Sequence, residues 1–221
     1  MILAGLIIGG LLALWLAYAA WLASAQNINY RQALVHAPLA LVRRVDARAL
    51  RNARNENRVI YVVSHQSKID PALMLALLPD ETLHILDPYS ARALWLEPWR
   101  ELARTITFNP EHVFVSRRLV RVLRGSGRLC VYLPVSATPD TREFRLYRAI
   151  SRIALRADAK VMPIHVSGSG DGKFSKLTVN ALRPMTIEEL IERNSESDMS
   201  SAALYKRVSE VATPPPPAKA A

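Results

Sequence analysis

The sequence of 221 residues contains a single cysteine, which excludes an intramolecular disulfide and a cysteine-rich metal site. Cys130 lies in the apolar run 129–133, where a thiol is typically a small core side chain and not a nucleophile. No glycine-rich phosphate loop occurs, and His84, His112 and His165 have no metal-ligand spacing. We therefore expect no metal and no cofactor, and interpret these three histidines as structural or surface residues.

Acidic residues are also scarce, because 19 Asp and Glu stand against 29 Lys and Arg, which gives a net charge of +10. Such an excess favours an anionic partner: a membrane surface, a phosphorylated substrate or a nucleic acid. We expect no nucleic acid, since the positive charge follows an apolar N-terminus and no binding module with interleaved aromatics is recognisable. The hydrophobic share of 50% excludes a disordered chain.

Charge is absent altogether from residues 2–25. A helix of this length spans roughly 36 Å, enough for a hydrocarbon core of roughly 30 Å. The segment 1–30 is therefore predicted to be a membrane anchor, either single-pass or a shallow monotopic insertion. A cleaved signal peptide ending at Ala23-Ser24-Ala25 is the alternative, but the stretch is long for one and no Lys or Arg precedes it.

The next segment, 31–58, carries seven arginines and only two acidic residues. This bias predicts that the C-terminal body lies in the cytoplasm. The expected localisation is the inner (plasma) membrane of a bacterial-type cell. The spacing of apolar residues over 39–54 predicts a basic amphipathic juxtamembrane helix that lies on anionic lipid. An ordinary surface helix with a solvated basic face is the alternative interpretation.

Residues 59–212 alternate short apolar runs with helical patterns, which predicts an α/β domain: a mostly parallel mixed sheet flanked by helices. The expected strands are 59–63, 83–86, 105–108, 129–133, 160–165 and 176–180. The expected helices are 71–78, 91–102, one capped by Asn109 and ending at Gly125, 142–157, 187–192 and 201–211. Residues 213–221 form a Pro/Ala tail that is expected to be disordered.

A histidine and an aspartate follow the strand 59–63 and stand five positions apart, as His65 and Asp70. Ligands of α/β sheets bind at the carboxyl ends of the strands. An imidazole oriented by a carboxylate can take a proton from an attacking hydroxyl, so His65 is the candidate base and Asp70 its orienter. In the alternative, Asp70 only caps the helix that begins at Pro71 and His65 is an ordinary loop residue.

Around these residues the sequence resembles the glycerolipid acyltransferase family, whose first motif is a His, four residues and an Asp. The resemblance covers 59–187 and includes Ser67-x-Ile69-Asp70, the segment 106–110 in place of a second motif and 161–164 in place of a fourth. It is strongest toward the acyltransferase half of the bifunctional acyl-carrier-protein synthetase and 2-acylglycerophosphoethanolamine acyltransferase.

This resemblance implies a membrane-anchored enzyme of phospholipid synthesis or remodelling. Its donor would be an acyl thioester on acyl carrier protein or coenzyme A, and its acceptor a lysophospholipid hydroxyl. It also implies that His65 and Asp70 are catalytic and that Ser67 helps to bind substrate.

The third motif departs from the family pattern, which is Phe-Pro-Glu-Gly followed closely by Arg. This sequence has Leu133-Pro134-Val135-Ser136, and Val135 cannot replace the carboxylate to which the resemblance assigns the acceptor's glycerol phosphate. The expected substitutes for substrate binding are Ser136, Thr138, Arg142 and Arg145. A solvated helix face is the alternative for the two arginines. For the whole chain, the alternative is a catalytically lapsed relative that binds lipid or a partner protein at the membrane.

Overall fold

The computed structural model describes residues 2–42, 44–50, 54–64, 67, 69–86, 92–101, 104–107, 113–133, 141–168, 176–193 and 200–212. Its centre is a seven-stranded sheet in the order β1-β7-β6-β2-β5-β3-β4, in which every neighbouring pair is parallel except β6 and β7. The strands are β1 (Val45–Asp46), β2 (Val59–Ser64), β3 (Leu83–Leu86), β4 (Arg104–Thr107), β5 (Arg128–Leu133), β6 (Lys160–Ser167) and β7 (Leu177–Ala181). The predicted fold class, a mostly parallel mixed sheet flanked by helices, is confirmed.

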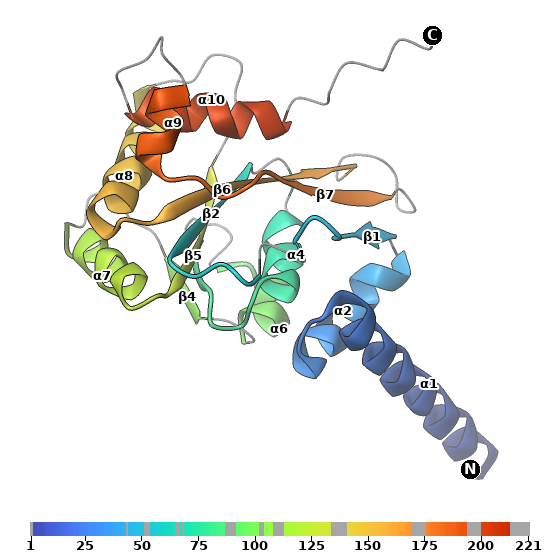
Figure 1. The fold of residues 1–221 in the computed structure, drawn as a ribbon. Coiled ribbons are helices and arrows are strands. Elements are labelled where there is room, and N and C mark those ends of the chain that lie inside the picture. Colours follow the sequence, from blue (N-terminus) through green and yellow to red (C-terminus); the bar gives the residue numbers. More distant parts are fainter. Residues whose placement is uncertain are drawn as a thin grey trace, which may run out of the picture.

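Helices cover both faces of the sheet (Figure 1). One face packs against α7 (Val113–Arg124), α8 (Thr141–Ala157), α9 (Ile187–Arg193) and α10 (Ser200–Ala212). The other packs against α4 (Asp70–Leu77), which is covered in turn by α2 (Tyr30–Val42), η1 (Leu94–Leu96) and α6 (Glu97–Arg100). The remaining helix, α1 (Ile2–Gln26), projects from the body on the α2 side.

The central strand is β2, whose six residues are all buried. It pairs with β5 on one side and β6 on the other. Val59, Tyr61 and Val63 face α4, whereas Ile60 and Val62 face the opposite helices. A strand covered on both faces must be apolar at every position, and this explains the unbroken apolar run that marked it in the sequence.

Most of the predicted elements are confirmed, but the helix expected over 91–102 is not continuous. It divides into η1 and α6, because Pro98 lies in the first turn of α6 and lacks the N–H that a continuous helix would need. Its end residues, together with Asn109 and the tail 213–221, lie outside the described residues.

The single amphipathic helix predicted over 39–54 is wrong. A helix, α2, begins earlier, contains Pro38 and ends at Val42, and β1 then joins the edge of the sheet. The N–H of Leu177 donates to the carbonyl oxygen of Arg44 (2.8 Å), and the Lys176 ammonium pairs with the Asp46 carboxylate (3.2 Å). This pairing with a strand far along the chain overrides the local helical pattern.

A hairpin of α1 and α2 forms the N-terminal part of the molecule. Ala19 and Leu22 of α1 pack against Ala33 and Ala37 of α2, and this contact includes only the C-terminal part of α1. The rest of α1 exposes its leucines and isoleucines. Residues 5–26 are long and apolar enough to cross a membrane, by length and composition alone.

Candidate functional site

The carboxyl ends of three strands meet at one edge of the sheet. Ser64, the last residue of β2, is in register with Leu133 at the end of β5 and with His165 near the end of β6. His65 follows Ser64 directly in the chain, and its own position lies outside the described residues. The parallel pairing of β2 therefore places Ser64, the residue before the predicted base in the chain, at the edge where α/β sheets bind ligands.

Asp70 lies at the start of α4 and is buried, with 1% of its surface exposed. Its carboxylate accepts a hydrogen bond from the N–H of Ser67 (2.8 Å), and its own N–H donates to the Ser67 carbonyl oxygen (3.1 Å). This reciprocal pair closes the turn between β2 and α4. A helix cap accepts from N–H groups inside the helix, whereas this bond holds the turn that precedes it.

Ser67, a predicted substrate-binding residue, belongs to the same turn. Its hydroxyl oxygen accepts from the N–H of Ile69 (3.4 Å), while its main chain holds the carboxylate of Asp70. Ser67 thus links the segment that contains His65 to the segment that contains Asp70. The contacts described give it a structural function in shaping the turn.

Sequence analysis missed a pair of polar residues at this edge. The Ser64 hydroxyl oxygen lies 2.6 Å from Nδ1 of His165, and both residues are buried. Burial lowers the pKa of His165, and the negative charge of Asp70 acts against that decrease, so His165 lies within the electrostatic range of Asp70. The sequence contains only a partial signal, because each residue is polar and stands at the end of an apolar run predicted to be a strand.

A second polar pair lies on the α4 side of the sheet, where His84 is buried and Tyr132 is partly buried. The Tyr132 hydroxyl lies 3.0 Å from Nδ1 of His84. Burial, followed by the charges of Cys130 and Asp70, raises the pKa of Tyr132. Burial alone lowers the pKa of His84 to about 3, which keeps its imidazole neutral.

The thiol of Cys130 is buried beside Tyr132, and burial raises its pKa to about 12. A thiol with that pKa is protonated at neutral pH and is therefore a poor nucleophile. The interpretation of Cys130 as a core residue is confirmed.

The other predicted binding residues are only partly placed. Ser136 and Thr138 lie outside the described residues, as does the side chain of Arg142, whose main chain is in the first turn of α8. Arg145 is exposed one turn further along α8. The structure thus brings Ser67 and Asp70 together, and β5 leads into the segment that contains the altered motif.

Comparison of the sequence with known protein families identifies the family of this chain. The family model described as acyltransferase matches residues 44–167, more than half of the chain. The chain belongs to the acyltransferase family. No curated protein matches it.

One solved structure has a similar fold over most of this chain. It is the 1-acyl-sn-glycerophosphate (LPA) acyltransferase PlsC from Thermotoga maritima, with a TM-score of 0.50 and 14% sequence identity. The match covers 90% of this chain and 92% of that chain. At this identity the likeness concerns the fold alone.

Proposed function

We propose that the protein transfers a fatty acyl group from a thioester donor to the hydroxyl of a lysophospholipid. The observation that carries the proposal is the closed turn between β2 and α4. It holds the buried Asp70 at the carboxyl edge of the sheet, five residues after His65, in a chain whose residues 44–167 match the acyltransferase family.

In the proposed mechanism, His65 removes the proton of the acceptor hydroxyl, and the hydroxyl oxygen attacks the thioester carbonyl. Main-chain N–H groups at the start of α4 or in the turn at Ser136 would stabilise the oxyanion. When the tetrahedral intermediate collapses, the C–S bond breaks and the thiolate takes the proton back from His65. Asp70 holds the imidazole in orientation and stabilises its charged form.

We further propose that α1 anchors this reaction in the inner membrane of a bacterial cell, with the catalytic body in the cytoplasm. The exposed leucines and isoleucines of α1 and the arginines that follow it support this orientation. Lysophospholipids reside in the bilayer, so the anchor would keep the site close to its acceptor. A mature protein that begins at Gln26 would contradict the anchor.

The experiment is an acyl-transfer assay with purified full-length protein and a panel of lysolipids that differ in head group. The panel should include the phosphoethanolamine, phosphoglycerol and plain phosphate forms. We expect transfer to at least one acceptor, and none when His65→Ala replaces the wild type.

Val135 favours a second candidate, a catalytically lapsed relative that binds lipid or a protein partner. Absence of transfer to every acceptor, with retained binding of lysolipid, would favour it. The double variant Val135→Glu with Ser136→Gly tests whether the motif can be restored: a gain in transfer would show that Val135 is the cause of the loss.

A further inference from the structure

The outer surface of α7 is basic over residues 117–124. Four arginines at helical spacing form one exposed stripe, and the helix contains no acidic residue: Arg117, Arg118, Arg121 and Arg124. Arg124 differs from the others, because its guanidinium donates to the main-chain oxygen of Arg156 at 2.7 and 3.2 Å. Its charge therefore also joins α7 to the end of α8.

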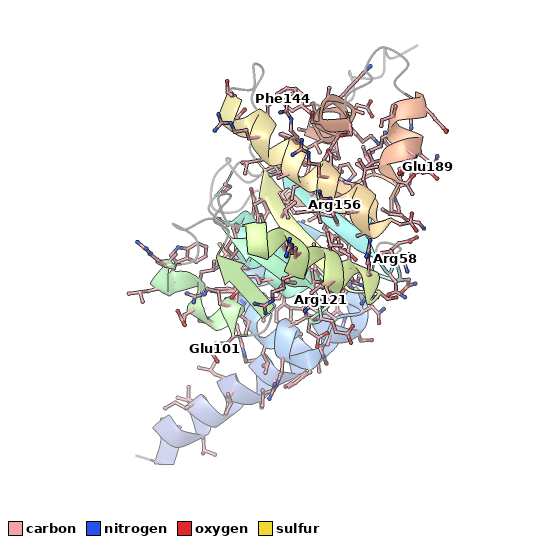
Figure 2. The ribbon with its side chains drawn as sticks, turned by 90° about the vertical axis from the view of Figure 1, so that its left-hand side faces the viewer. Arg58, Glu101, Arg121, Phe144, Arg156 and Glu189 are labelled. Carbon is pink, nitrogen blue, oxygen red and sulfur yellow. The ribbon has the colours of Figure 1, made fainter. Side chains whose placement is uncertain are left out.

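Helix α8 lies beside α7 and continues the same surface, on which Figure 2 shows Arg121 and Arg156 facing the viewer. Its exposed arginines repeat every three or four residues: Arg145, Arg148, Arg152 and Arg156. Glu143 is the only acidic residue of this helix. We call the exposed arginines of α7 and α8 the arginine face.

In the part of the chain that the structure describes, Arg117, Arg121 and Arg152 have no ion-pair partner. Some exposed cations elsewhere in the molecule are paired, as Arg58 is with Asp158 and Lys160 with Glu56. So much unpaired charge of one sign raises the local concentration of an anionic partner and steers its approach.

Two observations argue against the bilayer as the anionic partner of this face. The arginine face lies on the side of the sheet opposite to α2, away from the apolar α1 (Figure 1). A surface that lies on lipid also carries apolar side chains for insertion, whereas Leu155 is the one exposed large hydrophobic residue of the described part of these two helices.

The arginine face also begins at the edge of the sheet where the proposed site lies. Each of α7 and α8 starts after a strand that ends at the carboxyl edge of the sheet, so the stripes run from the edge that holds Asp70 toward the opposite edge. A partner bound on this face would have one end beside the proposed site.

We propose that the arginine face docks an acidic carrier protein that delivers the acyl thioester, so that the donor is protein-bound. The inference rests on the proposed function, and it selects acyl carrier protein over coenzyme A. The contacts are charge pairs between arginines and carboxylates at a solvated interface. They set the association rate and depend on salt.

The test compares two triple variants with the same loss of charge. The docking triple is Arg117→Gln, Arg121→Gln and Arg152→Gln; the control triple, also exposed, is Arg183→Gln, Arg193→Gln and Lys206→Gln. Full-length protein in phosphatidylcholine nanodiscs is titrated with labelled acyl carrier protein that lacks an acyl group, at low salt and at 0.5 M salt. Binding to anionic vesicles is measured in parallel.

We expect the docking triple to weaken carrier binding at least tenfold at low salt, the control triple to change it less than twofold, and high salt to remove the difference. In acyl transfer the docking triple should raise the KM for acyl carrier protein and leave the KM for acyl-coenzyme A unchanged. Equal weakening by both triples would overturn the proposal. So would normal carrier binding by a docking triple that has lost affinity for anionic vesicles.

The two proposals fail separately in this design. Carrier binding that depends on the arginine face, without transfer from any donor, would contradict the proposed function and leave the docking surface intact. Transfer from acyl-coenzyme A by a protein that does not bind the carrier would contradict only the docking surface.

Discussion

The two faces of the sheet are built differently. All eight residues of α4 are buried, including Asp70, because the helix lies between the sheet and a second layer formed by α2, η1 and α6. Helices α7 and α8 are amphipathic, with leucine, isoleucine and tyrosine toward the sheet and arginine toward solvent. The face of the sheet that carries α4 is connected through α2 to α1, whereas the helices on the other face, α7 and α8, are exposed to solvent.

This difference shows where the fold can carry chemistry. A carboxylate at the start of a fully buried helix is fixed by its surroundings, as the bond from Ser67 to Asp70 illustrates. An arginine on an outer helix remains free to meet a partner. The buried face therefore suits a precisely oriented group, and the outer face suits recognition by charge.

The largest contrast between the faces is expected in catalysis. His65→Ala should abolish acyl transfer, and Asp70→Asn should lower kcat less completely, by about 10² to 10⁴, because the base is removed in one case and misoriented in the other. Arg145→Gln on the outer face should leave kcat unchanged and raise only a KM, for the acceptor or for the carrier-bound donor. Steady-state kinetics with the best lysolipid measure all three, and full turnover by His65→Ala would contradict the assignment of the base.

Packing should show the next contrast. Leu75 points from α4 into the second layer and is fully buried with Leu86 and Leu96, so Leu75→Ala should cost about 2–5 kcal/mol of unfolding free energy. Leu155 on the outside of α8 is 38% exposed, and Leu155→Ala should cost less than about 1 kcal/mol. Denaturant unfolding in detergent measures both, and equal costs would show that α4 is not a middle layer.

A smaller effect is expected where the N-terminal hairpin joins the body. Arg54 donates through Nη1 to the main-chain oxygens of Gln26 and Asn27, at the end of α1. Arg54→Met keeps the apolar stem and leaves these two carbonyls without that donor, so it should lower the unfolding free energy by about 2 kcal/mol. The exposed Arg48→Gln is the control and should change it by less than about 0.5 kcal/mol.

The effect that should be smallest at neutral pH, and should grow only as the solution is acidified, is that of His84 on stability. The pKa of His84 is lowered to about 3 in the folded protein, so the unfolded chain takes up the proton first, near pH 6.5. The stabilisation is complete above pH 6.5 and is lost toward pH 3, at about 1.4 kcal/mol per pH unit. His84→Gln should remove that slope from a series of unfolding curves; an unchanged slope would show that His84 is not buried in neutral form.

The strands and helices of the core were predictable because their signals are local. A strand covered on both faces is an unbroken apolar run, as β2 and β5 are, and Pro71 marks the first turn of α4. Outer helices such as α8 show one apolar stripe. In each of these elements, the apolar positions in the sequence are the positions that become buried, so the pattern can be read without knowing the neighbouring elements.

The failures lie where distant segments meet. No residue near 44–46 indicates that this segment pairs with β7. The break in the helix expected over 91–102 depends on Pro98 alone, within an otherwise helical pattern. The pair of Ser64 and His165 is separated by 101 positions and exists only because β2 and β6 are neighbours in the sheet. Asp70 could be found from the sequence because it lies close to His65 in the chain. His165 was missed because it lies far from both residues in the chain.

By itself, the sequence determined the apolar N-terminal segment, the α/β alternation and the His65 and Asp70 spacing. Each is fixed by composition or by periods of two to five residues. Only the tertiary structure decided that Asp70 holds the turn through Ser67, that the edge also contains His165, and that the arginines of α7 and α8 share one surface. The physical reason is that strand order and helix packing depend on the burial of the whole core, and no local pattern encodes which strands become neighbours.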